Sequence, residues 1–584
     1  MKQFFKFTLA SALGVLIAGL VGFLLFFVII LGIASSSSAV YIAQPKTVLH
    51  LKLEGELVER SKEDPFGALF GNYMNRDMQI GLEDVLIAIK NAKENKNIEG
   101  IYIESGVFSG SAASIQEIRN ALIDFKQSDK FIIAYSGNYM QNAYYLSAVA
   151  DKVILNPQGA LDFRGLSAQP MFLKKALDNL GVNMQIFKVG TFKSATEMFS
   201  EDKMSDANRE QITEYIHAIW GQMLKDISAD RNISIDSLNV FADRMMTFRP
   251  ADQSLQCGLV DTLMYPNDVI DMLKEKVGTK KKKELNLASV SKVSNMGKTG
   301  KPEKNKIAVV YAAGDIDMNS SEGVVSDKLI KDLKKVREDE NVKAVVLRVN
   351  SPGGSAYGSE QIWKEVQAIK AVKPIVVSMG DYAASGGYYI SCAADYVIAQ
   401  PTTLTGSIGI FGLIPDVSGL LNKVGIGFDQ ITTNKFSDMP KTIRPMAADE
   451  KALIQSYVET GYDTFITRCA DGRKKTKEEI DQIGQGRVWA GEKAVQLGLV
   501  DALGGISDAI VKAAELASVD KYELDKYPVK KGFFELFMEG FETSMETRML
   551  QKFLGSNYKQ YDYLQRVQSM SGIQARLPFE MEIR

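Results

Sequence analysis

Histidine and cysteine are both scarce in this chain of 584 residues. His50 and His217 are the only histidines, so an imidazole base, if the protein uses one, must be one of these two residues. The three cysteines, Cys257, Cys392 and Cys469, include no pair at CxxC spacing. An odd and scattered set of cysteines argues against a disulfide framework and against a structural zinc site.

An excess of either charge is also lacking. The 69 basic and 71 acidic residues leave a formal net charge of −2, so we expect neither a nucleic-acid partner nor a strongly acidic substrate. No carboxylate pair, phosphate-binding loop or metal-ligand cluster stands out, and we expect no metal and no cofactor. A chain of this length exceeds what one hydrophobic core usually serves, which predicts two or more globular units.

The N-terminal segment contains the longest apolar run. After Lys2 and Lys6 no charged residue occurs from Phe7 to Pro45, and the run continues through GVLIAGLVGFLLFFVIILGIA. A membrane-spanning helix needs about 20 apolar residues, whereas the apolar core of a cleavable signal has about 7 to 15. We therefore predict an uncleaved anchor over residues 1–45, although the small residues of SSSSAV leave cleavage open; a buried core helix is the alternative. The positive N-terminal flank predicts a single-pass protein of the inner (cytoplasmic) membrane, with its body on the extracytoplasmic, periplasmic face.

The rest of the chain contains an internal repeat. FIIAYSGNYMQNAYYLSAVADKVILNP, which begins at Phe131, matches PIVVSMGDYAASGGYYISCAADYVIAQP, which begins at Pro374, and QCGLVDTL later matches QLGLVDAL. Two duplicated domains over residues 46–275 and 306–525 explain these matches. The lysine-rich segment 276–305 between them is interpreted as a linker.

Each half alternates short β-branched segments with helical patterns. KAVVLRV, PIVVSM and DYVIAQ are typical of buried strands, whereas SEQIWKEVQAIKAV has helical spacing. This alternation predicts crossover βαβ units around a mostly parallel sheet, that is, an α/β fold. Residues 526–584 have apolar residues at helical spacing and no match in the first half, so we predict a helical C-terminal extension.

Two turns in the second half could carry chemistry. In MGDYAASGGYYIS, Ser385 stands between a predicted strand and a predicted helix, and Gly386 follows it, so that free backbone N–H groups there could hold an oxyanion. In VVLRVNSPGGSA a strand runs into a turn at which Gly353 or Gly354 could supply a second N–H donor. Taken alone, an N-cap serine and an ordinary strand–helix turn would explain both segments.

Together, several motifs resemble those of the signal peptide peptidase A family in its long, duplicated form, which belongs to the ClpP/crotonase superfamily. They are GTFKSATE in the first half and NSPGGS, DYAASGGYYI and TGSIGIFG in the second, and they occur in the same order as in the family. The resemblance implies two tandem ClpP/crotonase-like domains built from ββα-type superhelical repeats. It also implies a serine peptidase that cuts cleaved signal peptides and other short unfolded peptides, and a homo-tetrameric bowl that encloses the sites.

The general base implied by the resemblance is Lys193, which stands in GTFKSATE at the position of the family's lysine. Met198 departs from that motif, which usually has proline there. A lysine of ordinary pKa, about 10.4, is almost wholly protonated at neutral pH, so Lys193 can act as a base only in a buried, apolar setting. The resemblance also gives Ser407 in TGSIGIFG a hydrogen bond to the lysine amine. Lys435 is the second choice for the base.

The two halves complement each other in these residues. Gln141 or Asn142 aligns with Ser385, and Ser437 aligns with Lys193, so neither half holds both a nucleophile and a base. The sequence predicts a site assembled from both halves, within one chain or between neighbouring chains. A crotonase-like acyl-thioester enzyme and a non-catalytic membrane scaffold are the alternatives, and the apolar span together with GTFKSATE favours the peptidase over both.

Overall fold

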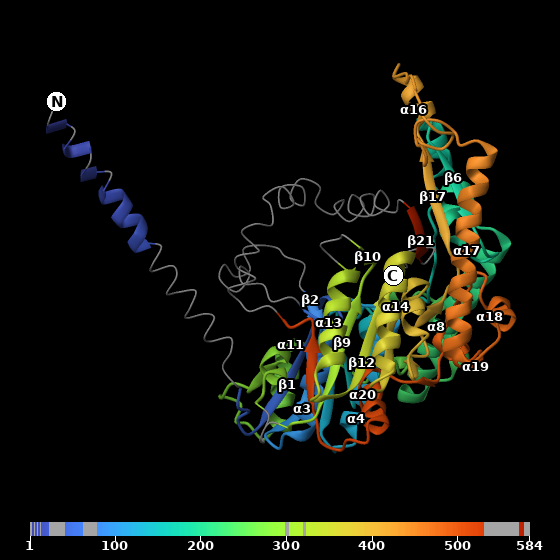
Figure 1. Ribbon diagram of the computed structural model, residues 1–584. Helices are drawn as coiled ribbons and strands as arrows, with labels where there is room; N and C mark the ends of the chain where they lie inside the picture. The colour runs from blue at the N-terminus through green and yellow to red at the C-terminus, as the bar shows by residue number, and fades with distance from the viewer. Residues whose placement is uncertain are drawn as a thin grey trace.

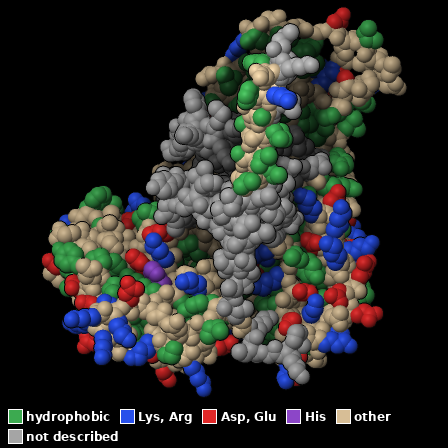
Figure 2. All heavy atoms as spheres, turned by 90° about the vertical axis from the view of Figure 1, so that its left-hand side faces the viewer, with side chains coloured by type: hydrophobic (Ala, Val, Ile, Leu, Met, Phe, Trp, Pro, Cys, Tyr) green, Lys and Arg blue, Asp and Glu red, His purple; other side chains and the backbone are tan. Residues whose placement is uncertain are grey.

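The computed structural model describes residues 3–4, 6–8, 10–11, 13–22, 41–61, 79–297, 303–318, 323–530 and 572–576. Within these residues the chain forms a body of two helix-covered sheets and a third sheet that rises from it (Figure 1). Acidic and basic side chains are interspersed over the body (Figure 2), in keeping with the balanced charge of the sequence.

The first sheet is parallel and belongs to the first half. Its order is β2-β1-β3-β4-β5-β7, with β8 also paired to β1. The strands are β1 (Thr47–Val58), β2 (Gln79–Gly81), β3 (Ile98–Ser109), β4 (Phe131–Ser136), β5 (Lys152–Leu155), β7 (Thr262–Leu263) and β8 (Leu287–Ser289). Their central residues are mostly buried Val, Ile and Leu, because helices cover both faces of the sheet.

The second sheet repeats this arrangement in the second half. Its order is β18-β16-β14-β12-β9-β20, and β15 pairs with β14 and β19. The strands are β9 (Lys306–Ala313), β12 (Val342–Ser351), β14 (Ile375–Ala384), β15 (Tyr396–Ala399), β16 (Leu404–Gly406), β18 (Val488–Ala490), β19 (Ala502–Leu503) and β20 (Glu523–Tyr527). The parallel series β9, β12, β14, β15, β19 corresponds to β1, β3, β4, β5, β7 of the first sheet, which confirms the predicted α/β class and the duplication.

The third sheet joins the two halves. Its order is β11-β10-β13-β21-β17-β6, and its strands are β6 (Asn183–Lys188), β10 (Ile316–Asp317), β11 (Val324–Val325), β13 (Gly353–Ser355), β17 (Phe411–Asp416) and β21 (Gly572–Arg576). The antiparallel pair β6–β17 rises from the body beside the long helix α17 (Figure 1). A strand of the first half is thereby held against a strand of the second.

The helices follow the same division. The first half has α3 (Leu82–Glu94), α4 (Ala112–Lys126), α5 (Gln141–Ser147), α6 (Lys174–Leu180), α7 (Glu197–Ser200), α8 (Asp206–Arg231), α9 (Ile235–Asp243), α10 (Ala251–Gln256), α11 (Pro266–Lys276) and α12 (Val290–Ser294). The second has α13 (Ser326–Glu338), α14 (Ala356–Lys370), α15 (Gly386–Ser391), α16 (Ser418–Lys423), α17 (Ala448–Arg473), α18 (Lys477–Ile483), α19 (Gly491–Gln496) and α20 (Ile506–Leu516). Short 3₁₀ turns, η2 (Ser194–Thr196) and η3 (Met246–Phe248), complete the first half.

The structure corrects two predictions, those for the C-terminal extension and for the linker between the halves. The helical prediction for residues 526–584 is wrong for residues 572–576, which form β21, because this segment pairs with strands on both sides and long-range pairing overrides local spacing. Residues 531–571 and 577–584 of that extension lie outside the described residues. Part of the predicted linker 276–305 also joins the first sheet, since β8 pairs with β1.

The predicted membrane anchor is only partly described. Among the described residues, no helix is both long enough and apolar enough to cross a membrane. Residues 23–40, which include much of the apolar run, lie outside the described residues. The anchor over residues 1–45 therefore stays a prediction.

Candidate active site

Ser385 lies in the tight turn between β14 and α15. Its backbone has φ 54° and ψ −113°, a region that non-glycine residues seldom adopt. The turn is fixed from both sides, because Ser385 N donates to Gly406 O at 2.8 Å and Tyr389 N donates to Ser385 O at 2.8 Å. Strain of this kind costs about 1–3 kcal/mol and persists only where the surroundings enforce it. Here it fixes the direction of the Ser385 side chain.

Lys193 reaches this serine from the other half of the chain. It follows β6 and immediately precedes η2, and both Lys193 and Ser385 are fully buried. Its Nζ lies 2.8 Å from Ser385 Oγ, 3.0 Å from Ser407 O and 3.1 Å from Ser407 Oγ. The structure thus brings together, within one chain, the three side chains that the sequence singled out.

The surroundings of Lys193 favour its neutral form. Burial lowers the pKa of Lys193 well below its ordinary value. A neutral amine has two N–H donors and one lone pair. The two N–H groups can bind the carbonyl and hydroxyl oxygens of Ser407, which leaves the lone pair for the hydroxyl proton of Ser385. The contacts therefore allow a proton to pass from Ser385 Oγ to Lys193 Nζ.

The loop that carries Lys193 is held by Gln211 of α8. Gln211 Nε2 donates to Phe192 O at 3.1 Å and to Ser194 Oγ at 2.8 Å, and its Oε1 accepts from Val488 N at 3.2 Å. The side chain is fully buried. Sequence reasoning missed Gln211, because a single glutamine on a long helix has no local pattern that marks it.

Ser407 lies at a second constrained turn, between β16 and β17. Its φ is 48°, and its N–H donates to Arg487 O at 2.7 Å. The following residues close the site, because Ser385 Oγ can also donate to Gly409 O at 3.3 Å. A Cβ atom on Gly409 would lie 3.2 Å from Lys193 Cδ. The aliphatic part of the lysine is therefore tightly enclosed.

The two candidate oxyanion glycines of the NSPGGS turn differ in position. A Cβ atom on Gly353 would lie 2.8 Å from Gly386 N, so these two glycines are adjacent. Gly354 instead faces Ile316, whose carbonyl oxygen would lie 2.1 Å from an added Cβ. With φ of 105° at Gly353, the turn requires glycine there on conformational grounds as well. The structure places Gly353, rather than Gly354, next to Gly386.

The rival bases have partners elsewhere. His50 Nε2 lies 2.7 Å from Glu104 Oε2, and the ring stacks on Tyr102. His217 Nδ1 lies 2.7 Å from the carbonyl oxygen of Thr213, one turn earlier in α8. The side chain of Lys435 is 69% exposed and pairs with Asp449 at 2.5 Å. In this chain, Lys193 is the base candidate that contacts Ser385.

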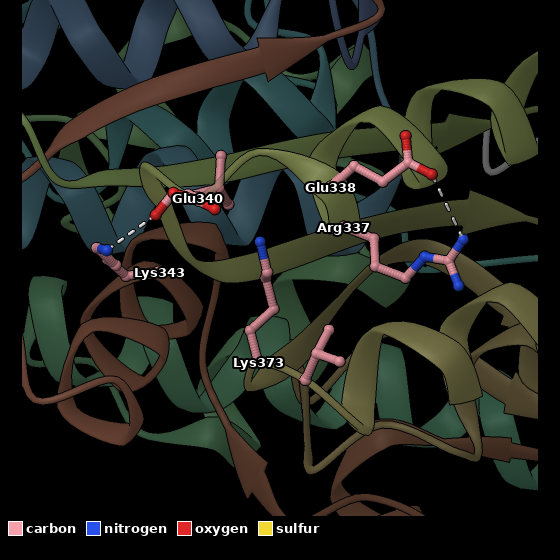
Figure 3. A pocket seen from close by; sticks show the side chains of 7 residues that line it. Arg337, Glu338, Glu340, Lys343 and Lys373 are labelled. Carbon is pink, nitrogen blue, oxygen red and sulfur yellow. Dashed lines mark hydrogen bonds and ion pairs between the residues drawn. The ribbon is translucent and has the colours of Figure 1, made fainter.

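A separate hollow of about 570 Å³ lies at the opposite end of the second sheet. Figure 3 shows the charged side chains that line it, which are Arg337, Glu338, Glu340, Lys343 and Lys373. Lys343 lies at the start of β12 and Lys373 precedes β14, whereas Ser385 follows the end of β14. The hollow is therefore not part of the Ser385–Lys193 site. Among the described residues, no cluster of His, Cys, Asp and Glu could hold a metal ion.

Comparison with known proteins places the chain in a family. The profile of peptidase family S49 matches residues 124–280 and 367–520, and that of Clp protease matches residues 305–405. Protease 4 of Salmonella typhi is 39% identical over 516 residues, 86% of this chain and 83% of the relative. Protease 4 of Haemophilus influenzae is 34% identical and covers 85% and 83%. The chloroplastic serine protease SPPA of Arabidopsis thaliana is 30% identical and covers 73% and 64%.

The matched profiles span both halves of the chain, including the segments that carry Lys193 and Ser385. The site residues are a serine, a lysine and backbone groups, and the fold around them is the ClpP-like α/β fold. The comparisons favour a peptidase over the acyl-thioester enzyme and the scaffold. The chain belongs to peptidase family S49 and is a serine peptidase.

Proposed function

We propose that this protein hydrolyses peptides with Ser385 as nucleophile and Lys193 as general base, and that its substrates are cleaved signal peptides and other short unfolded chains. The observation that carries the proposal is the buried amine of Lys193, whose Nζ has Ser385 Oγ and both oxygens of Ser407 within 3.1 Å. No carboxylate or imidazole is needed to complete this arrangement.

The reaction follows from these contacts. Neutral Lys193 takes the hydroxyl proton while Ser385 Oγ attacks the substrate carbonyl carbon. The N–H group of Gly386 holds the oxyanion, together with that of Gly353, which donates to Ser351 Oγ at 3.2 Å in the structure and turns to the oxyanion when substrate binds. The protonated amine then gives its proton to the leaving nitrogen, and the peptide bond breaks to leave an ester on Ser385. Water, deprotonated by Lys193, hydrolyses this ester and restores the serine.

The substrate class is supported by the burial of the site. Ser385 and Lys193 are both 0% exposed, which favours a substrate that enters as a narrow extended chain. A folded surface could not reach that far. Together with the resemblance to signal peptide peptidase A, this favours short or unfolded peptides, such as signal peptides after their release.

The location and assembly of the protein form a further part of the proposal. Residues 1–45 anchor the chain in the cytoplasmic membrane, the catalytic body faces the extracytoplasmic side, and four copies assemble into a bowl. The uncharged run from Phe7 to Pro45 supports the anchor, and the family resemblance supports the tetramer. Protease accessibility in spheroplasts and light scattering of the detergent-solubilised full chain test the two parts separately.

A covalent probe tests the dyad. A fluorophosphonate should label the wild-type protein at Ser385, and neither Ser385→Ala nor Lys193→Ala should be labelled at neutral pH. Lys435→Ala is the matched control and should be labelled like the wild type. Equal labelling of Lys193→Ala and wild type would show that another group activates the serine.

A further inference from the structure

A short segment of the second half closes over the lysine loop. Residues 484–487, the cover segment, lead from α18 into β18. Gly486 of this segment is packed so closely on Lys193 that an added Cβ atom would lie 2.6 Å from the lysine Cβ atom. Its φ of 79° also favours glycine, and its N–H donates to Ile408 O at 2.8 Å. The cover segment is therefore part of the wall that keeps water from the Lys193 side chain.

Backbone hydrogen bonds tie the cover segment to both halves of the site. Gln485 O accepts from the N–H of Phe192, the residue before the candidate base, at 2.9 Å. Arg487 O accepts from Ser407 N at 2.7 Å. The same short segment thus holds the loop of the lysine and the turn that binds the lysine amine. Its position bears directly on the 2.8 Å distance between that amine and the serine hydroxyl.

The side chain of Arg487 fixes the cover segment to the first half. Its Nη2 binds Glu210 Oε1 and Glu214 Oε2 of α8, both at 2.7 Å. Its guanidinium carbon lies 4.4 Å from the ring centres of both Phe192 and Trp489. Phe192 belongs to the first half and Trp489 to the second. Ring contacts as well as ion pairs of one arginine therefore cross the boundary between the halves.

We propose that Arg487 is a positioning residue of the dyad, which holds the cover segment against the Lys193 loop and so keeps water away from the amine. This inference rests on the proposed function, because Arg487 acts through the same amine. A planar guanidinium stacks on aromatic rings and presents several N–H donors to carboxylates, whereas an ammonium is a compact point charge. The position therefore requires arginine and not only a positive charge.

The charge of Arg487 is not what acts on the amine. Burial lowers the pKa of Lys193, and the neighbours of its Nζ are Ser385, Ser407 and the ring of Phe411, whose centre lies 5.9 Å away. The charged side chains of the elements packed around the loop have partners of their own: Arg487 has Glu210 and Glu214, Glu197 has Ser205 and Asn208, and Asp481 has Tyr462. Loss of Arg487 acts on the pKa through the water that enters, since water favours the charged amine.

The pH dependence of fluorophosphonate labelling tests this role. In Arg487→Met, the midpoint of the rise in labelling rate should move up by about one pH unit, toward the ordinary lysine pKa, because the amine becomes hydrated. Below both midpoints, labelling should then be about tenfold slower than in the wild type. Arg487→Lys should also raise the midpoint, because it keeps the charge and loses the planar contacts. An unchanged midpoint in Arg487→Met would overturn this inference alone, whereas an unlabelled wild type would overturn the proposed function too.

Arg468→Met is the matched control. The guanidinium carbon of Arg468 lies 4.1 Å from the ring centre of Trp363, and its Nη2 binds Glu360 at 2.7 Å. Both partners belong to the second half, so this arginine makes the same kinds of contact without joining the halves. Its loss should leave the midpoint unchanged. An equal shift in Arg468→Met and Arg487→Met would contradict the specific role of Arg487.

Glu214→Gln tests the same connection without removing the arginine. It should raise the midpoint by less than Arg487→Met does, because Glu210 and both ring contacts remain. The glutamate is 39% exposed, so the variant should fold even if Arg487→Met does not. In the double variant, Glu214→Gln should add little to the shift of Arg487→Met, since both changes act on one connection. Additive shifts, or no shift in Glu214→Gln, would contradict the attachment of the cover segment through α8.

Discussion

The two halves of the molecule have sheets of the same arrangement, but the equivalent turn has a different role in each half. In the second half, the turn from β14 to α15 presents Ser385 to the lysine amine at 2.8 Å. In the first half, the turn from β4 to α5 presents Gln141, whose Oε1 accepts from Arg164 N and Gly165 N at 3.0 Å each. The residue at the first turn thus holds the backbone of a later segment, whereas the residue at the second turn contacts the lysine amine.

The loops that carry the candidate lysines show the reverse, because here the first half holds the residue that reaches the site. Lys193 of the first half is fully buried, while Lys435, two residues before the position that aligns with it, is exposed and paired with Asp449. Each half has therefore kept one part of the site. In the proposed dyad the two duplicated domains therefore supply one residue each, which requires that the halves be held rigidly together.

A buried ion cluster provides such a connection. Arg348 of β12, which is 1% exposed, binds Glu59 at 3.0 Å and Glu117 at 2.8 Å, both from the first half. Burial raises the pKa of Glu59 despite this arginine. The corresponding residue of β3 is Glu104, which pairs with His50 near the surface. At this strand position, the charged residue of the second sheet, Arg348, contacts the other half, whereas Glu104 of the first sheet does not.

The largest effect should come from the lysine of the first half. Lys193→Ala should lower kcat for a peptide substrate by about 10⁴-fold, as expected for the loss of a residue that acts as a unit with the nucleophile. Lys435→Ala should change kcat by less than twofold, because its side chain is exposed. Steady-state kinetics of both variants checks this, and a comparable loss in the two would remove the distinction between the halves.

The next largest effect should come from the connection between the halves. Arg348→Met leaves Glu59 and Glu117 buried without their partner and should lower the free energy of unfolding by about 3–5 kcal/mol. Glu104→Gln, the matched change in the first sheet, should cost less than about 1 kcal/mol because that pair is partly exposed. Urea unfolding of both variants measures the difference, and equal costs would refute the bridging role of Arg348.

Ser407→Gly should have a smaller effect on catalysis. It removes the hydroxyl group that lies 3.1 Å from Lys193 Nζ but keeps the carbonyl contact and tolerates the φ of 48°. Loss of orientation of the amine should lower kcat by about 10- to 100-fold with little change in KM. A rise in KM with unchanged kcat would instead assign Ser407 to substrate binding.

The smallest effect is a gain in stability that depends on pH. The pKa of Lys193 is lowered in the folded protein by burial, so between that pKa and the ordinary value the unfolded chain binds one more proton and stability rises with pH. The slope is at most about 1.4 kcal/mol per pH unit. Lys193→Met has no group that titrates at this position. The variant should therefore be more stable than the wild type at neutral pH, by a margin that shrinks as pH rises. Thermal unfolding across pH checks this, and a constant margin would contradict the lowered pKa.

The α/β class, the duplication and the residues that meet at the site could be predicted from the sequence, because motifs such as GTFKSATE and DYAASGGYYI are short continuous segments. Gln211 could not be found in this way, since its role comes from three contacts to segments distant in the chain. β21 was mistaken for helix because its five residues become a strand only through pairing with β13 and β17. The choice between Gly353 and Gly354 likewise needed the backbone geometry.

The pH dependence of Ser385 modification tests the central claim most directly. The second-order rate of fluorophosphonate labelling should rise with pH as the Lys193 amine loses its proton and should level off well below the ordinary lysine pKa. The same rise and plateau in Lys193→Ala would contradict transfer of the Ser385 proton to an amine supplied by the first half.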